Sequence, residues 1–478
     1  MLLVRPPESM GLLGRQIIHE PLNLLVLAAA ARSAGADVRV LDLALSDDPG
    51  AYDRALREYD PHLIGYSAMT QDIHAAALLA EHAKRTHPDA VTVVGGVHAS
   101  VLPERTLAEF PSFDMAVVGE GEATLAELTR RVACSEEFIG IPGVVRRFEE
   151  NIVAESPRGF LDIENVPLPA RDLVDVDAYL SRTSTPGVTG AVARVATLFT
   201  ARGCPYRCSF CSGHITCGKN PRYTPLELVR EEVTQLANTY GAAHITIKDD
   251  TFTTNPMRAL AVGEILHDAG LTWDCKTRIN TVERFLLEEM KRLGCTRLSM
   301  GVESGSDRVL AAIGKQISVD KVEQAFALTR EIGFDRSAYF IIGADPDETT
   351  EEFEQSLALA KRIRPEFPVF SVIVPYPGTA VFRQLSERGF IFSEEWRRYN
   401  PFVQRPVWRT ANFSPDDLMA MQKKAMTELY FSGWFIAGKL ATLRHLSAWG
   451  YWARSAVDFI KYRKTRGDSG NPDPDGLV

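Results

Sequence analysis

The run Ala201-Arg-Gly-Cys-Pro-Tyr-Arg-Cys-Ser-Phe-Cys-Ser-Gly213 contains Cys204, Cys208 and Cys211 in the spacing C-x3-C-x2-C. Three thiolates this close in sequence can bind three irons of one [4Fe–4S] cluster. The fourth iron then has no protein ligand and is free to bind a small molecule. A zinc loop is the alternative, because zinc prefers four Cys or His ligands and His214 lies nearby.

Size, charge and cysteine usage limit the classes of protein that this chain can belong to. With 478 residues it is too long for one ordinary hydrophobic core, so two or three domains are expected. The formal net charge of −9 argues against a surface that binds nucleic acid. We see no signal-peptide pattern, no apolar run of transmembrane length and no disulfide framework among the seven scattered cysteines. We therefore expect a cytoplasmic protein.

The first 140 residues predict an α/β domain, because apolar runs alternate with helical patterns five times. Expected strands cover 2–5, 38–43, 63–67, 91–95 and 115–118, and expected helices cover 22–34, 52–59, 73–86, 102–110 and 123–133. This order predicts a doubly wound, flavodoxin-like parallel sheet. Such sheets bind ligands beyond the carboxyl ends of their strands.

Residues 195–388 repeat the β-α alternation and predict a partial (β/α)6 barrel. Expected strands cover 196–200, 244–248, 273–277, 297–301, 338–342 and 369–374. The chemistry of α/β barrels lies at the carboxyl ends of the strands, and polar residues gather there in this sequence. Residues 141–194, rich in proline and polar side chains, are predicted to be a linker.

The C-terminal region, 389–465, predicts aromatic-rich helices that cover the open barrel and its substrate. Its last helix has an apolar stripe over 443–460 and several basic residues. That helix is expected to pack over the barrel, or to make peripheral contact with a membrane surface. The tail 466–478 is rich in glycine, proline and aspartate and is expected to be disordered.

The cysteine spacing, with Phe210 just before the last cysteine, resembles the radical S-adenosylmethionine (SAM) superfamily. Further strings match proteins of that superfamily at the expected strand ends: D-D-x-F-T-x-N from 249, G-V-E-S-G-S-D from 301, G-x-x-P-D-E-T from 343 and P-Y-P-G-T from 375. The resemblance implies that the open iron binds the amino and carboxylate groups of SAM. An electron from the cluster then cleaves SAM to a 5′-deoxyadenosyl radical.

The resemblance also suggests which side chains contact SAM. Asp249 or Asp250 is expected to bind the amino group, although either could instead cap a helix. Glu303 is expected at the ribose diol, with a structural salt bridge as the alternative. Arg278 is the candidate for the methionine carboxylate, because a guanidinium offers two parallel donors, and Phe210 is expected against the adenine.

The pattern G-G-x-H-A-S at 95–100, followed by V-G-E-G-E at 118–122, resembles the cobalamin-binding domain joined to many radical SAM enzymes, and P-L-P-A-R-D at 167–172 resembles their linker. The residues that this implies for cobalamin binding are Ser67, Thr70, Gly95, Gly96, His98, Gly119 and Glu120. His98 could instead bond to backbone, and Glu120 could sit at a helix N-terminus. No D-x-H-x-x-G motif follows the first strand, so we expect cobalt without a histidine on its lower face.

The domain order resembles the cobalamin-dependent radical SAM family of class B methyltransferases and the anaerobic magnesium-protoporphyrin cyclase. It implies methylation of an unactivated carbon or phosphorus of a small metabolite, with an external electron donor of flavodoxin or ferredoxin type. A cyclase, oxidase or ring-rearranging enzyme without net methylation is the alternative, and a cobalamin carrier without radical chemistry is a more distant one. Cys275 and Cys295 are expected in the core, while Cys217 is a candidate hydrogen donor.

Overall fold

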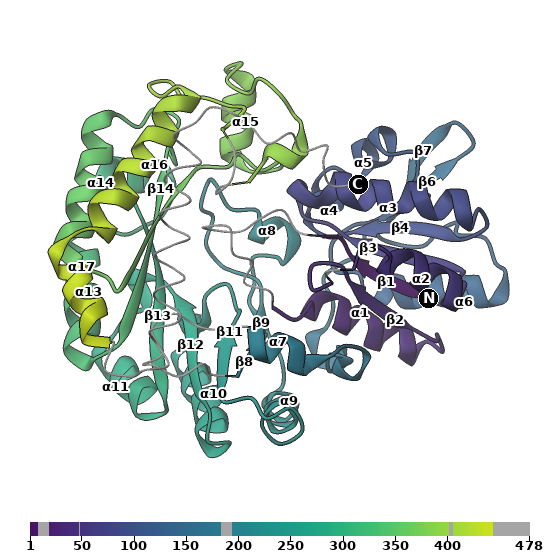
Figure 1. Cartoon of the computed structure of the whole chain (residues 1–478), viewed down its shortest axis with the longest axis horizontal. Coiled ribbons are helices and arrows are strands. Elements are labelled where there is room, and N and C mark those ends of the chain that lie inside the picture. The colour runs from purple at the N-terminus through teal and green to yellow at the C-terminus, as the bar shows by residue number, and fades with distance from the viewer. Residues whose placement is uncertain (8–18, 47, 183–193, 401–404, 443–478) are drawn as a thin grey trace.

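The computed structural model describes residues 1–7, 19–46, 48–182, 194–400 and 405–442. The expected apolar stripe over 443–460, its membrane contact and the tail 466–478 lie outside these residues. Two α/β parts lie side by side, an N-terminal one in purple and blue and a larger barrel in teal to green (Figure 1). Within the described ranges no helix is both long and apolar enough to cross a bilayer.

The N-terminal part is a doubly wound sheet, as predicted. Its parallel strands lie in the order β2-β1-β3-β4-β5. They are β1 Leu2–Arg5, β2 Arg39–Asp42, β3 Leu63–Ser67, β4 Val91–Gly95 and β5 Met115–Val117, and the helices are α1 Leu22–Ser33, α2 Ala51–Tyr59, α3 Ile73–Thr86, α4 Val97–Val101, α5 Pro103–Glu109 and α6 Glu122–Cys134. Alternate residues of each strand face opposite layers: Leu3, Leu63 and Val93 pack with α1 and α6, and their neighbours pack with α2, α3 and α5.

A hairpin extends this sheet where the sequence predicts a linker. β6 Val144–Phe148 pairs antiparallel with β5, and β7 Asn151–Ala154 pairs with β6. Val144 and Val145 are buried, whereas the rest of the hairpin is half-buried or exposed. Strands at the edge of a sheet are only partly covered, so they need not be the apolar runs that buried parallel strands are. The hairpin therefore lacks the pattern by which the other strands are recognised in the sequence.

The second part is an open, six-stranded parallel barrel, as predicted. Its sheet runs β15-β14-β13-β12-β11-β8 and leaves β8 and β15 as edges. The strands are β8 Val195–Leu198, β11 His244–Ile247, β12 Thr272–Thr277, β13 Cys295–Glu303, β14 Asp335–Ile342 and β15 Phe367–Val372, and the outer helices are α9 Leu226–Asn238, α10 Pro256–Asp268, α11 Arg284–Arg292, α13 Val319–Ile332, α14 Thr350–Ile363 and α15 Ala380–Glu387. Cys275 and Cys295 are buried in its core, as expected.

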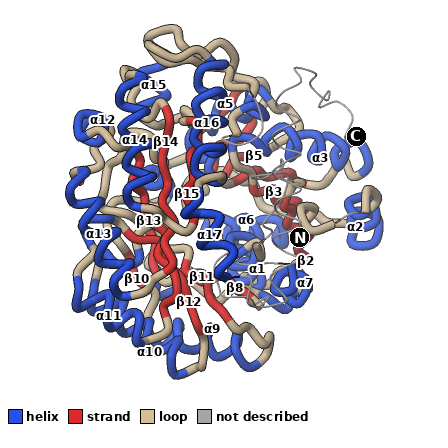
Figure 2. Tube along the Cα trace, turned by 60° about the vertical axis from the view of Figure 1, so that its left-hand side comes forward, coloured by secondary structure: helices blue, strands red, loops and turns tan. Residues whose placement is uncertain are grey.

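Helix α16 (Pro415–Tyr430), followed by α17 (Gly433–Thr442), lies against the edge strand β15 (Figure 2). The Gln422 amide donates to the Phe370 carbonyl at 2.9 Å, and the Tyr430 hydroxyl donates to the Pro368 carbonyl at 3.1 Å. These carbonyls belong to the edge of the sheet, where a further strand would otherwise pair. The side chains of α16 therefore donate hydrogen bonds to carbonyl groups that the backbone of a seventh strand would otherwise bond.

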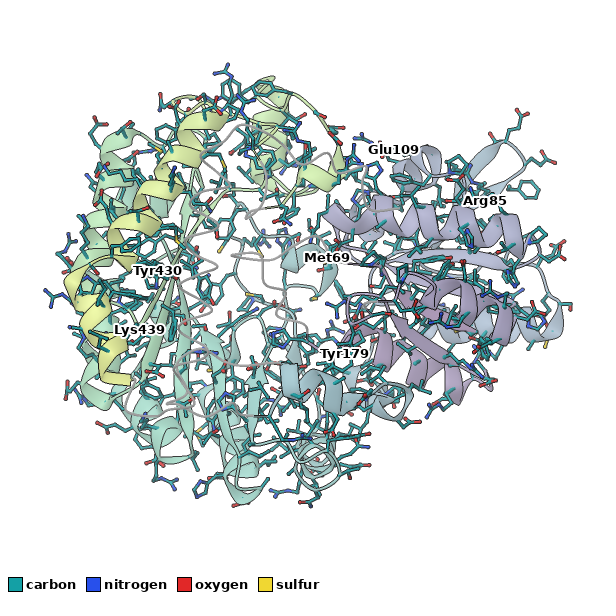
Figure 3. The ribbon with its side chains drawn as sticks, in the orientation of Figure 1. Met69, Arg85, Glu109, Tyr179, Tyr430 and Lys439 are labelled. Carbon is teal, nitrogen blue, oxygen red and sulfur yellow. The ribbon has the colours of Figure 1, made fainter. Side chains whose placement is uncertain are left out.

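Arg171, in the segment between the two parts, is fully buried and joins them. Its Nε lies 3.3 Å from Glu20 Oε2, and its Nη2 donates to the Thr197 carbonyl at 3.1 Å. Its Nη1 lies 2.7 Å from Glu232 Oε1 and forms a second ion pair. Nearby, the Tyr179 hydroxyl donates to Asp42 at 2.7 Å, at the boundary visible in Figure 3.

Candidate active site at the junction of the two parts

The cysteine loop follows the short strand β9 (Ala201–Arg202) and ends at α8 (Gly213–Thr216), which faces the N-terminal part (Figure 1). The loop is held by backbone bonds: Cys204 N–H donates to the Gly218 carbonyl at 3.1 Å, and Ser209 N–H donates to the Ile313 carbonyl at 3.0 Å. Gly203 has φ +98°, and a Cβ there would lie 2.8 Å from the Asn220 carbonyl oxygen. Only glycine fits this approach without strain.

The three thiols of the loop lie within electrostatic range of one another. Burial raises the pKa of Cys211, and the neighbouring Cys208, Asp250 and Cys204 raise it further. Among the described residues no three His, Cys, Asp or Glu side chains are close enough to hold a single metal ion. A cubane cluster binds each of its cysteines through a separate iron, so three thiols that hold one need not converge on a single metal ion.

Arg278 brings a positive charge to the cluster loop. Its Nη1 lies 3.4 Å from Cys208 Sγ, and its guanidinium stacks on the Tyr206 ring at 3.6 Å. Its Nη2 donates to the Lys315 carbonyl. The structure thus brings Arg278 to the cysteines, and its contact with the SAM carboxylate stays a prediction.

The two adjacent aspartates have different surroundings. Asp249 is buried and accepts from Thr200 N–H at 2.7 Å, Thr200 Oγ1 at 2.6 Å and Ala201 N–H at 3.1 Å. Burial raises its pKa to about 6. Both of its oxygens therefore hold the start of the cysteine loop in place. Asp250 instead lines the cavity described below, so this geometry favours Asp250 over Asp249 for the SAM amino group.

Glu303 lies at a bulge of β13, with φ +69°. Its Oε1 accepts from Lys315 Nζ at 2.6 Å, and both side chains are buried. A Cβ on Gly301 would lie 2.2 Å from that carboxylate oxygen. The salt bridge expected as the alternative is therefore present, and it engages Oε1 of Glu303. Phe210 is half-buried and packs against Val309, Leu310, Ile313 and Ala344 beneath the loop.

A cavity of about 370 Å³ joins the two parts of the molecule. On the N-terminal side it is lined by the carboxyl ends of β3, β4 and β5, including Ser67, Met69, Gly95, Gly96, Gly119 and Glu120. On the barrel side it is lined by Phe199, Ala201, Arg202, Thr216, Cys217 and Asp250. The half-exposed Met69 points into the space between the parts (Figure 3). Residues predicted to contact cobalamin and a residue predicted to contact SAM thus face one space.

The glycine loop after β4 lines this cavity with backbone that carries no side chains. Gly96 has φ +98°, and a Cβ there would lie 2.6 Å from the Ala68 carbonyl oxygen. The Ser100 hydroxyl accepts from Gly119 N–H at 2.9 Å, and Ser67 accepts from Asn23 at 2.7 Å. Two loops are thereby tied together at the point where a doubly wound sheet binds its ligand.

Two predicted cobalamin contacts do not reach the cavity. His98 is buried in α4 with its ring against Trp396, centroids 5.2 Å apart, and both ring nitrogens lack a hydrogen-bond partner. Burial lowers its pKa to about 4, so the ring is neutral. Thr70 is buried at the start of a short 3-10 turn. The helix begins directly after Gly96 and turns His98 toward the interior, which a motif alone does not reveal.

Glu120 and Glu122 form an ion-pair network across the junction. Glu120 pairs with Arg222 at 2.7 Å and Arg202 at 3.2 Å, and Glu122 pairs with Arg202 at 2.6 Å. Burial opposes ionisation of Glu120, but the bonds from Arg222 and from Leu161 N–H keep its pKa below the usual value. Glu120 thus links the loop that follows β5 to Arg202 and Arg222, which lie on either side of the cysteine loop. Neither arginine was singled out in the sequence, because neither belongs to a motif.

The fold and this junction define a radical SAM enzyme with a B12-binding domain. Residues 14–129 match the B12 binding domain, and residues 198–360 match the Radical SAM superfamily. The chain is 32% identical over 438 residues to the uncharacterized methyltransferase PH0819 of Pyrococcus horikoshii, covering 90% of this chain and 92% of that protein. The chain therefore belongs to this family of B12-binding radical SAM proteins, and membership implies a [4Fe–4S] cluster, SAM and cobalamin.

Other relatives differ in their named activities. The chain is 30% identical over 382 residues to the hopanoid C-3 methylase of Methylococcus capsulatus (78% of this chain, 70% of that protein). It is 28% identical over 363 residues to the anaerobic magnesium-protoporphyrin IX monomethyl ester cyclase of Cereibacter sphaeroides (72% and 56%). The radical SAM methyltransferase TsrM of Kitasatospora setae has a similar fold, with a TM-score of 0.71, 19% identity and coverage of 90% and 88%.

Proposed function

We propose that this chain transfers a methyl group from SAM, by way of cobalamin, to an unactivated carbon or phosphorus atom of a small-molecule substrate. The observation that carries the proposal is the single cavity lined both by the loops of the B12-binding domain and by Asp250 beside the cysteine loop. A methyl donor and a radical-generating centre that share one cavity can act on the same substrate atom.

When bound, the cluster supplies the electron that cleaves SAM to a 5′-deoxyadenosyl radical, and cobalamin carries the methyl group. The residues of the chain bind and orient these groups. Cys204, Cys208 and Cys211 hold the cluster, and the Arg278 guanidinium lies 3.4 Å from Cys208 Sγ. Asp250 is our choice for the SAM ammonium group because its carboxylate faces the cavity. Glu303, with one oxygen held by Lys315, keeps the other for the ribose diol.

The surroundings of the cavity support a cobalt whose lower face lacks histidine. No histidine is found among the residues that line it in the described part of the chain. His19 contacts Lys248, His74 packs edge-on against Phe110, and His98 packs against Trp396. Cobalamin held without a histidine from this chain would supply a methyl group that a carbon radical takes up more readily, which suits the proposed reaction.

The proposed reaction also needs an electron from outside the chain. We assign this role to a donor of flavodoxin or ferredoxin type, acting in a reducing cytoplasm where exposed thiols such as Cys134 stay free.

The test uses the full chain, reconstituted anaerobically with cluster and cobalamin, and SAM that carries a deuterated methyl group. Incubation with a small-molecule extract and a reductant should yield S-adenosylhomocysteine, 5′-deoxyadenosine and a metabolite that has gained the labelled methyl group. A Cys208→Ser variant is the control and should give neither deoxyadenosine nor the labelled metabolite. Substrate-dependent deoxyadenosine without any labelled metabolite would refute methyl transfer.

The second candidate is a cyclase or oxidase that uses the same cofactors. It is favoured by the similarity to the magnesium-protoporphyrin cyclase over 72% of this chain. The same experiment separates the two, because a cyclase changes the mass of its substrate by hydrogen or oxygen atoms and transfers no deuterium.

A further inference from the structure

The inner face of the barrel carries an unusual row of side chains. Along β11 to β14, alternate residues such as Ile247, Cys275, Met300 and Phe340 pack outward in the hydrophobic core with the helices. Their neighbours must point into the lumen, because side chains alternate along a strand. The strand register places three of these neighbours side by side, Lys276, Ser299 and Ser337. Lys248 extends the row, because it follows Ile247, the partner of Cys275, directly at the end of β11.

We propose that this row, two ammonium groups followed by two hydroxyls, binds an anionic group of the substrate, such as a phosphate, phosphonate or carboxylate. The inference rests on the proposed function and adds the chemical class of the substrate. Lysine ammonium groups and serine hydroxyls all donate hydrogen bonds to anion oxygens.

The two lysines lie within electrostatic range of each other. Burial and then the nearby charge of Lys276 lower the pKa of Lys248 to about 8, although Asp274 opposes this shift. Lys248 Nζ lies 3.0 Å from His19 Nε2, and burial lowers the pKa of that histidine to about 3. The imidazole is therefore neutral and positions the ammonium group without cancelling its charge. Within the described ranges, Lys276 makes no hydrogen bond or ion pair.

The charges in the next row of the lumen are already balanced. Asp274 accepts from His244 Nε2 at 2.9 Å, from Thr246 at 3.1 Å and from Arg297 at 2.8 Å. It is thus engaged with partners of its own row. Asp335, at the far end of this row, has its pKa raised to about 6, first by burial and then by Glu366. Within the described ranges neither Lys248 nor Lys276 is part of an ion pair, whereas Asp274 is paired with Arg297.

The position of the row relative to the reacting groups fits a substrate anchor. The charge of Lys276 opposes the burial that raises the pKa of Asp250, so these side chains are within electrostatic range. Asp250 lines the cavity and lies beside the cysteine loop. An anion held at the lysines would leave the rest of the molecule near the radical site.

Two exposed aromatic rings suggest the nature of that remainder. Phe199 is 47% exposed and lines the cavity, and Tyr339 is 42% exposed and lies two residues beyond Ser337 on the same face of β14. Large exposed rings inside a protein offer an apolar surface to a ligand. The substrate class is therefore an apolar or planar body that carries an anionic group.

The proposal is tested by lysine acylation of the full, reconstituted protein without turnover, read by mass spectrometry of the peptides. At constant ionic strength, inorganic phosphate, benzoate or naphthyl phosphate should slow acylation of Lys276 saturably, on the order of tenfold at saturation, since a charged hydrogen bond contributes about 1.5–3 kcal/mol. Lys321 and Lys361, on outer helices, serve as internal controls and should react at unchanged rates. Comparing phosphate with benzoate distinguishes a phosphate-type from a carboxylate-type anion.

Variants give the second measurement. Lys276→Met should weaken naphthyl phosphate binding roughly tenfold, whereas Lys276→Arg should retain most of this binding. Neutral naphthol should bind equally well to the wild type and to both variants. The exposed Lys276 is preferred because loss of the more buried Lys248 could disturb folding. Lys361→Met is the matched control.

Protection of Lys276 by none of the anions, or equal binding of naphthyl phosphate by wild type and Lys276→Met, would overturn the proposal. So would competition by SAM, because it would assign the lysines to the SAM carboxylate. No step of this test requires methyl transfer, so a failure of the proposed function and a failure of this inference are distinguishable.

Discussion

Replacing Arg171 by methionine should lower the free energy of unfolding, because this side chain joins the two parts of the molecule. At an effective dielectric constant of about 20, attractions over 2.7 Å and 3.3 Å are each worth about 5–6 kcal/mol. Most of this is offset by the desolvation of the buried charges. Removing one partner, however, leaves the carboxylates of Glu20 and Glu232 buried and unpaired, and such losses amount to about 3–5 kcal/mol.

The loss of stability caused by Arg171→Met should depend on pH. Burial raises the pKa of Glu232 even with Arg171 present, and loss of the cation raises it further. A carboxyl whose folded pKa is raised stabilises the fold most below its unfolded pKa of about 4.3, and this contribution is lost as pH rises through the folded pKa. Arg171→Met should therefore be most destabilising near pH 8 and recover partly toward pH 5. Adding Glu232→Gln should restore part of the stability at pH 8.

Urea titration followed by tryptophan fluorescence is the assay. All six tryptophans lie at or after residue 273, so the signal reports on the barrel and the C-terminal region. Arg32→Met is the matched control, because Arg32 pairs with Asp172 in an exposed position and should cost at most about 1 kcal/mol. A loss for Arg171→Met below about 1 kcal/mol at pH 8, or one that does not shrink toward pH 5, would refute the reasoning.

Three further outcomes follow from the described geometry. Cys208→Ala should lose the visible absorbance of the reconstituted cluster but keep cobalamin, and Cys134→Ala on the exposed side of α6 should lose neither; equal spectra would contradict the cluster assignment. Gly96→Ala, whose Cβ would meet a backbone carbonyl, should cost about 1–3 kcal/mol and reduce cobalamin retention in gel filtration, whereas Gly119→Ala, which carries the backbone strain of a φ of +79° but no such clash, should retain more. Burial raises the pKa of Glu348 to about 8, so stability to urea should fall as pH rises through that value and Glu348→Gln should flatten the fall; parallel curves would disprove it.

Sequence patterns predicted the strands of both sheets because buried parallel strands are apolar runs bounded by turns. β1, β3 and β4 begin and end at the predicted residues. The β6–β7 hairpin was not predicted, because strands at the edge of a sheet need not be buried apolar runs.

Side-chain direction at the site was less predictable than position in the chain. The cysteine spacing located the cluster loop, and the strand ends located Asp250 and Glu303. The partners that decide the roles of Glu303 and Asp249 are Lys315 and Thr200, which lie 12 and 49 residues away in sequence and carry no motif. Lys248 and Lys276 could have been found, because alternation along two predicted strands already places both in the lumen.

The helix that closes the barrel edge has a consequence for how this enzyme could change its substrate. The cysteine loop is anchored beside β8, at one edge of the sheet, and α16 is fastened to β15, at the other edge, by the side chains of Gln422 and Tyr430. Substitutions on α16 can widen or narrow the gap between the two edges of the sheet without moving the strand beside the cysteine loop. Substrate size and radical generation are thus adjustable separately within one barrel.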